Sequence, residues 1–282
     1  MKIINKILKI VLVFIVSILI LSAALFGYSK YVEPKLLTVK NYEINENKDK
    51  STKMIKVVQF TDSQLGDFYK LSQLDDVVEK INNQNPDVVV FTGDLIDKMS
   101  EYEEKEDVSN ALSKISANLG KFAIWGNHDY GGGGHKYYEN IMEKAGFKVL
   151  VNETIEIALN NNQSLSISGL DEAMFGSPDS ELLIKNMKKS DFNLLLLHEP
   201  DLIDEFKNSN VNLALAGHSH GGQVAVPFMG AIITPPIAKK YTKGFYDIEK
   251  DIKLYVNTGL GNTKMPYRFM NIPQISIFNI SI

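Results

Sequence analysis

The stretch 55-IKVVQFTDSQLG-66 places a carboxylate directly after an apolar run. Residues 55–60 have the continuous apolar character of a strand that is buried on both faces. Asp62 and Gln64 follow in a short polar segment that ends at Gly66. A strand that delivers a carboxylate into a tight turn is a common way to present a metal ligand, but here the second polar residue is an amide. The segment is therefore half of a metal site, a degraded one, or only a polar loop.

The same arrangement recurs twice further along the chain. The runs 87-DVVVFTGD-94 and 121-KFAIWGNHD-129 are again apolar stretches that end in polar residues. Between the three runs lie 71–84 and 104–117, which have helical spacing or helical composition. Helices between strands suit right-handed crossovers in a parallel sheet, and ligands bind outside the carboxyl ends of such strands. The first half therefore predicts an α/β sheet with a site at one edge.

The second half of the sequence predicts a second sheet. Residues 148–170 alternate between apolar and polar and contain polar turn residues, which is typical of antiparallel strands. Two later apolar runs, 192-FNLLLLHEP-200 and 211-VNLALAGHSHGG-222, end in histidines, and 252–261 and 274–282 supply further strands. Three of the five histidines therefore follow late strands.

Each polar strand end has an ordinary explanation when taken alone. An Asp or Asn after a strand is commonly a turn or helix-cap residue. Together, five strand ends would gather carboxylate, amide and imidazole groups at one edge. Carboxylates gathered there would repel one another, and divalent cations would neutralise them.

The chain resembles the calcineurin-like metallophosphoesterases. The similarity is carried by five ordered blocks: Asp62-x-Gln64, 93-GD-94, 126-GNHD-129, His198 and 217-GHSH-220. The segments 217–231 and 255–269 further resemble the membrane-associated bacterial branch of that family. The resemblance implies an α/β, four-layer fold in which two mixed β-sheets pack together and are flanked by helices.

The resemblance also implies two divalent metal ions and a role for each block. It assigns the first metal to Asp62, Gln64 and His220, the second to Asn127, His198 and His218, and the bridge between them to Asp94. It makes His128 the acid near the leaving oxygen, with Asp129 orienting it. It also places an arginine at Arg268, whose guanidinium could pair with a substrate phosphate; an ordinary ion pair is the alternative.

The ligand chemistry suits Mn²⁺ best, with Zn²⁺ or Fe²⁺ as alternatives. Two such cations would polarise a phosphoryl group and activate a water as hydroxide for attack. The family usually has histidine where this chain has Gln64. A glutamine carbonyl oxygen binds hard metals without adding charge, so Gln64 is expected to tune the first metal site. A weakened or lost first metal is the alternative.

The N-terminal segment is expected to lie in a membrane. Residues 10–27 are apolar or small without charge, which gives about 27 Å of helix at about 1.5 Å per residue. We expect 1–30 to be a membrane anchor, with a cleaved signal peptide as the alternative because Ser22 is followed by two alanines. Residues 31–53 are expected to be a tether and 54–282 the metallophosphoesterase domain.

Composition limits the partners and the compartment. The formal net charge is -4, which does not indicate a long basic track for nucleic acid. Lysines before the apolar run favour a cytoplasmic N-terminus, so a single-pass protein of the cell membrane with an extracytoplasmic domain is expected. The expected activity is hydrolysis of phosphodiester or pyrophosphate bonds, in lipid or nucleotide substrates, at the membrane surface. The alternatives are an exported phosphomonoesterase and a catalytically weak metal-binding module; no protein partner is inferred.

Overall fold

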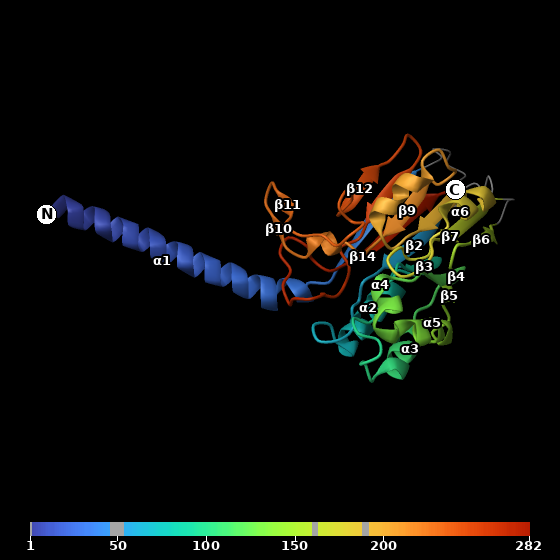
Figure 1. Cartoon of the computed structure of the whole chain (residues 1–282), viewed down its shortest axis with the longest axis horizontal. Coiled ribbons are helices and arrows are strands. Elements are labelled where there is room, and N and C mark those ends of the chain that lie inside the picture. Colours follow the sequence, from blue (N-terminus) through green and yellow to red (C-terminus); the bar gives the residue numbers. More distant parts are fainter. Residues whose placement is uncertain (1, 46–53, 160–162, 188–191) are drawn as a thin grey trace.

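Two mixed six-stranded sheets form the centre of the computed structural model, which describes residues 2–45, 54–159, 163–187 and 192–282 (Figure 1). The first sheet has the strand order β1-β14-β2-β3-β4-β5. Its strands are β1 (Thr38–Asn45), β14 (Gln274–Ser281), β2 (Met54–Phe60), β3 (Val88–Phe91), β4 (Gly120–Ala123) and β5 (Lys148–Val149). The strands β2 to β5 are parallel, as the alternation of strands and helices predicts.

The second sheet has the strand order β12-β13-β9-β8-β7-β6. Its strands are β12 (Gly244–Asp247), β13 (Lys253–Val256), β9 (Leu213–Ala216), β8 (Phe192–Leu196), β7 (Ser164–Gly169) and β6 (Glu153–Ala158). The central four are parallel, and an antiparallel strand closes each edge. The antiparallel pairing of β6 with β7 confirms the alternation seen in 148–170.

The main core lies between the two sheets. Alternate residues of the first sheet, such as Ile55 and Val57 on β2, pack against Leu194 and Leu213 of the second. The intervening residues, such as Val58, face the opposite side and contact helices. Both faces of these strands are therefore buried, which explains why their sequences are continuously apolar.

Helices cover the outer face of each sheet and complete four layers. The first sheet is covered by α2 (Leu71–Asn82), α3 (Lys105–Ser113) and α5 (Tyr138–Lys144). The second is covered by α6 (Ser180–Asn186) and the 3₁₀ helix Pro200–Phe206. Short helical turns occur at η1 (Glu33–Lys35), α4 (Asn127–Tyr130), η2 (Gly131–Lys136) and η5 (His220–Gly222). The small hairpin of β10 (Ala225–Val226) and β11 (Gly230–Ala231) stands apart from both sheets. The predicted α/β four-layer fold is confirmed.

The N-terminal helix α1 (Lys2–Tyr31) extends away from the two sheets (Figure 1). Within the described residues it is the one helix long and apolar enough to cross a membrane, and its apolar window is not buried against the rest of the chain. A helix that is apolar all round and uncovered is typical of a membrane span. A signal sequence passes the same test of length and composition.

The strand β1 falls inside the range expected to be a tether. It pairs in parallel with β14, from Thr38 opposite Gln274 to Asn45 opposite Ser281. The strand has a polar composition because an edge strand buries only a few side chains. Val39 packs toward the helices, and Tyr42 and Ile44 pack toward the core between the sheets. The remainder of the expected tether, 46–53, lies outside the described residues.

Candidate metal centre

The polar residues predicted at five strand ends meet at one edge of the two sheets. Asp62 follows β2, Asp94 follows β3 and Asn127 follows β4, while His198 follows β8 and His218 follows β9. The first sheet therefore supplies the Asp and Asn side chains of the site, and the second sheet supplies the His side chains. Six of the expected ligands are almost fully buried, with 0 to 4 % of their surface exposed: Asp62, Gln64, Asp94, His198, His218 and His220.

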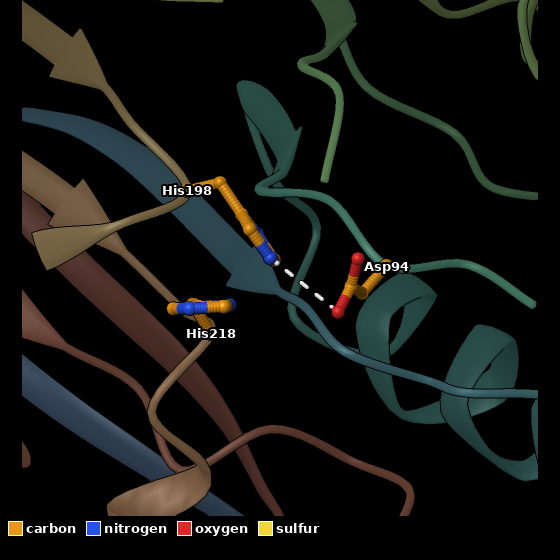
Figure 2. Close-up of side chains that lie close together, drawn as sticks. All are labelled: Asp94, His198 and His218. Carbon is orange, nitrogen blue, oxygen red and sulfur yellow. Dashed lines mark ion pairs between the residues drawn. The ribbon is translucent and has the colours of Figure 1, made fainter. Parts of the chain in front are cut away.

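Two groups of potential metal ligands form there and share Asp94. One consists of Asp94, His198 and His218, and the other of Asp62, Asp94 and His220; in each group the ligand atoms lie within 4.8 Å of one another. Figure 2 shows the first group, with the imidazole of His198 directed at the Asp94 carboxylate. The Nε2 atom of His198 lies 3.4 Å from Oδ2 of Asp94. This arrangement is what a bridging Asp94 between two metal positions requires.

Four of the expected ligands carry a buried atom without a hydrogen-bond partner among the described residues. These atoms are Gln64 Oε1, Asn127 Oδ1, His198 Nε2 and His220 Nδ1. A buried polar atom without a hydrogen-bond partner destabilises the fold by about 1–3 kcal/mol, so a cluster of such atoms indicates a binding site for a ligand. Carboxylate, amide oxygen and imidazole nitrogen are ligands for divalent cations, and the site therefore fits such ions.

Backbone carbonyls orient two of the imidazole rings. Nδ1 of His198 lies 2.7 Å from the carbonyl oxygen of Thr92, and Nε2 of His218 lies 3.0 Å from that of Pro236. An N–H that donates to each carbonyl directs the other ring nitrogen inward, where it could bind a metal once it is unprotonated. Metal-binding histidines are held in the required tautomer by such outer contacts.

The backbone is strained at the same positions. Five expected ligands have a left-handed backbone, with φ of 50° at Asp62, 47° at Gln64, 63° at Asp94, 64° at His218 and 49° at His220. This region is sparsely populated by residues other than glycine and occurs most often at functional sites. The fold thus holds these side chains in place at a cost in conformational energy.

Glycine at two positions allows the ligand loops to approach closely. A Cβ at Gly126 would overlap the carboxylate of Asp94, and one at Gly217 would overlap the carboxylate of Asp62. These are the glycines of the GNHD and GHSH blocks. Any side chain there would push apart the two halves of the metal centre.

Burial and crowding alter the acidity of these groups. Burial raises the pKa of Asp62 to about 6, whereas burial and the neighbouring His198 lower the pKa of His218 to about 3. Burial alone would lower the pKa of His198, but the Asp94 carboxylate raises it well above its usual value. The ion pair between His198 and Asp94 holds a proton that a metal ion would have to displace.

The imidazole of His128 is held by Asp97 and not by Asp129. Nδ1 of His128 lies 2.8 Å from the carbonyl oxygen of Asp97 and 3.3 Å from its Oδ1 atom. The carboxylate of Asp129 instead accepts three backbone N–H groups, from Asp94, Leu95 and Gly126, at 2.8 to 2.9 Å. The carboxylate of Asp129 thus joins two ligand loops, and its expected role in orienting His128 stays a prediction. Asp97 was missed, although it stands three residues after Asp94 in 94-DLID-97.

Arg268 does not face the metal centre. Its side chain is fully buried, with Nε donating to Asn262 Oδ1 at 3.1 Å and Nη1 donating to the carbonyls of Thr258 and Asn271 at 2.9 and 2.8 Å. Nη2 donates to the carbonyl of Gly261. With these donors used by the surrounding loop, the geometry does not support the expected contact with a substrate phosphate. Arg268 instead supports the loop that closes over Gln64.

A cavity of about 450 Å³ opens beside the expected ligands. One wall carries Gln64, Asp94, Asn127 and His128, together with the two GHSH histidines. Apolar side chains also line the cavity, among them Ile232, Ile233, Pro235, Met174 and Met265, beside polar ones such as Thr263 and Lys264. A lining that combines polar and apolar side chains suits a ligand that combines an anionic group with an apolar part.

Comparisons with known proteins agree with this site. The calcineurin-like phosphoesterase family profile matches residues 55–222. The metallophosphoesterase YkuE of Bacillus subtilis is 40 % identical over 261 residues, covering 90 % of this chain and 89 % of its own. The metallophosphoesterase Cj0846 of Campylobacter jejuni is 31 % identical, covering 95 % of this chain and 70 % of its own. Phosphodiesterase YaeI of Escherichia coli is 29 % identical, covering 84 % and 86 %. The chain therefore belongs to the calcineurin-like phosphoesterase family and is a metal-binding hydrolase.

Proposed function

We propose that the chain is a membrane-anchored phosphoesterase that uses two divalent metal ions to hydrolyse phosphodiester or pyrophosphate bonds. The observation that carries the proposal is the pair of ligand groups joined at Asp94, with four unpartnered ligand atoms directed at them. One metal would be held by Asp62, Gln64 and His220, and the other by Asn127, His198 and His218. Two bound cations would supply Lewis acidity and an activated water.

His128 is proposed as the acid for the leaving oxygen. It lines the cavity beside Asp94 while Asp97 holds its Nδ1 atom, which leaves Nε2 for the substrate. Burial alone would lower the pKa of His128, but Asp94 and Asp97 raise it. A ring that keeps its proton near neutral pH is suited to protonate a departing alkoxide.

Manganese is the proposed native metal, with zinc or iron as alternatives. Gln64 and Asn127 contribute neutral amide oxygens, and these oxygens favour harder cations over the softer members of the series. Nε2 of Gln64 donates to Oδ2 of Asp94, so the Oε1 atom of the same amide is turned away from that hydrogen bond and remains unpartnered. This geometry supports Gln64 as a ligand through Oε1.

The proposed substrates are phosphodiesters or pyrophosphates of lipids or nucleotides near a membrane. The helix α1 supports the location, because a tether raises the local concentration of the enzyme at the membrane. The name of YaeI supports diester chemistry, which is a property of that protein. Lys2, Lys6 and Lys9 precede the apolar run, so we place the N-terminus in the cytoplasm and the catalytic domain on the other side.

The test is metal reconstitution of the full chain in detergent. The protein is stripped of metal and then given Mn²⁺, Zn²⁺, Fe²⁺ or Mg²⁺, and bound metal is counted in the samples used for assay. We expect two ions per chain and faster cleavage of bis-p-nitrophenyl phosphate than of p-nitrophenyl phosphate. Faster monoester cleavage would favour the exported phosphomonoesterase. At most one ion without turnover would favour a metal-binding module whose first site is impaired at Gln64.

A further inference from the structure

The hairpin β10–β11 exposes apolar side chains in a conformation that the fold itself does not explain. Phe228 and Met229 at its tip are 109 % and 83 % exposed, and Ile232 and Ile233 after it are 63 % and 72 % exposed. Phe228 has a φ of 68°, in a turn closed by the Met229 N–H donating to the Val226 carbonyl at 3.1 Å. Glycine or asparagine is the usual residue at such a turn position, so a bulky aromatic side chain is strained there.

The base of this hairpin is hydrogen-bonded to Phe269, which in turn contacts the last turn of α1. The Ala225 N–H donates to the Phe269 carbonyl at 2.9 Å, and the Phe269 N–H donates to the Gln223 carbonyl at 2.8 Å. The Phe269 ring contacts the Tyr28 ring of α1 edge-on, with the centroids 6.5 Å apart. The next residue back, Arg268, donates its backbone N–H to the Ser29 carbonyl at 2.8 Å. The hairpin and the last turn of α1 are thus parts of one connected structure.

This connection fixes the level of the hairpin relative to a bilayer. Tyr28 directly follows the apolar run 10–27, and tyrosine at that position lies among the lipid headgroups. The turn at the tip starts one residue after Ala225, so the side chains of Phe228 and Met229 lie close to that level. Figure 1 shows the hairpin on the side of the domain from which α1 extends.

We propose that the hairpin β10–β11 is a second membrane contact, with Phe228 and Met229 inserted into the lipid beside α1. The inference rests on the proposed membrane anchoring. The structure favours a lipid bilayer as the partner of this hairpin. The run 226-VPFM-229 is uncharged, and the base of the hairpin is bonded to Phe269, whose neighbour Arg268 is bonded to Ser29 of α1. Exposed apolar residues beside an anchor gain free energy by entering lipid.

The residues that follow the hairpin tip also line the cavity beside the metal centre, which bears on the class of substrate. Ile232 and Ile233 lie after the tip and also line the cavity that contains Asp94 and His218. Apolar side chains therefore occur both at the hairpin and in the lining of the cavity that holds the expected ligands. A substrate whose acyl chains stay in the bilayer can keep apolar contact while its phosphate reaches the metals. We infer that the substrate is a lipid-anchored phosphoester or pyrophosphate.

The membrane contact is tested with the full chain in phosphatidylcholine–phosphatidylglycerol nanodiscs. The sequence contains no cysteine, so Met229→Cys provides a single site for an environment-sensitive fluorophore. The control is Glu181→Cys, on the exposed first turn of α6 at the far end of the domain from α1 (Figure 1). We expect a blue-shifted label at 229 that is quenched several-fold by doxyl lipids, and an unquenched label at 181. A label at 229 that stays in water overturns the contact.

The substrate inference is tested with the double variant Phe228→Ser, Met229→Ser. Neither residue lines the cavity, and both are exposed, so folding and cleavage of bis-p-nitrophenyl phosphate are expected to be unchanged. Cleavage of a diacyl phosphodiester in the nanodiscs is expected to fall about tenfold, or about 1.4 kcal/mol in transition-state free energy. Equal loss with both substrates, or no loss with either, overturns the inference. Failure of the unaltered chain to cleave either substrate would instead refute the proposed function, while the label at 229 still reports the contact.

Discussion

The side-chain amide of Gln64 donates a hydrogen bond to Asp94, with Nε2 2.6 Å from Oδ2, and leaves its own Oε1 atom buried without a partner. This geometry supports the proposed role of Gln64, the residue that departs from the usual family pattern, as a metal ligand. We predict that Gln64→His retains turnover within about tenfold and shifts the preferred metal from Mn²⁺ toward Zn²⁺ or Fe²⁺, because imidazole is the softer donor.

Turnover and bound metal are measured across the four cations. The control is Gln84→His, in the turn between α2 and β3, at the end of the sheet opposite to the metal centre. A metal preference that does not change in Gln64→His would place Gln64 outside the set of ligands.

Asp94 is the residue common to both ligand groups, so its loss should affect both metals. We predict that Asp94→Asn reduces bound metal from two ions toward none and lowers turnover at least about 100-fold, the upper range seen for residues that merely support a ligand. Metal analysis and diester cleavage measure both effects. The matched control is Asp75→Asn, since Asp75 is an exposed aspartate on α2. Two retained ions would refute the bridging position.

Asp97 should act on the chemical step through His128. We predict that Asp97→Asn retains both metals and the melting temperature but lowers kcat about 10- to 100-fold, because the proton-donating ring loses its carboxylate neighbour. The Asp97 carboxylate helps to raise the pKa of His128, so its removal should lower that pKa. The basic limb of the pH–rate profile, where the acid loses its proton, should therefore move to lower pH. An unchanged profile would limit Asp97 to a structural role.

Arg268 should contribute to folding and not to substrate binding. We predict that Arg268→Met lowers the free energy of unfolding by at least about 3 kcal/mol, because several buried carbonyls lose a charged donor. Thermal denaturation measures the loss, with Lys98→Met as an exposed control. The KM for the soluble diester is expected to stay near that of the unaltered chain in the folded protein. A raised KM with unchanged stability would restore the phosphate-binding role.

Metal binding should release a proton from His198. The metal-free pKa of this imidazole is raised above its ordinary value by Asp94, so the ring is protonated at neutral pH and must lose that proton to bind. Affinity should therefore increase as pH rises toward the raised pKa and fall as pH decreases. Titration calorimetry in two buffers of different ionisation enthalpy counts the released protons. The count should fall by about one in His198→Asn, and an unchanged count would exclude His198 as the source.

The ligand positions could be predicted from sequence because they depend on short-range order. Each follows an apolar strand by two to four residues, and the chain topology then brings the strand ends together. The roles of Arg268 and Asp129 could not be predicted in this way. Both are set by which backbone groups lie within 3 Å of the side chain, and that depends on how the loops fold.

The strand β1 and the hairpin β10–β11 show the same limit for longer elements. β1 has a polar sequence, and only its partner β14 identifies it as part of the sheet. In the hairpin, the run 226-VPFM-229 gives no sign that Phe228 is strained and exposed. Periodicity predicts elements that bury a complete face, but not edge strands or exposed turns.

The pairing of β1 with β14 also sets the order in which the protein can be completed. Thr38 lies opposite Gln274, so the first strand after α1 stays without its partner until nearly all of the chain has been synthesised. β14 also pairs with β2, which places the last strand between two early ones. Such distant pairing is slow to form because a long loop must close first. A growing chain therefore presents α1 well before its first sheet can close, and the edges of β1 and β2 that pair with β14 stay exposed throughout that interval.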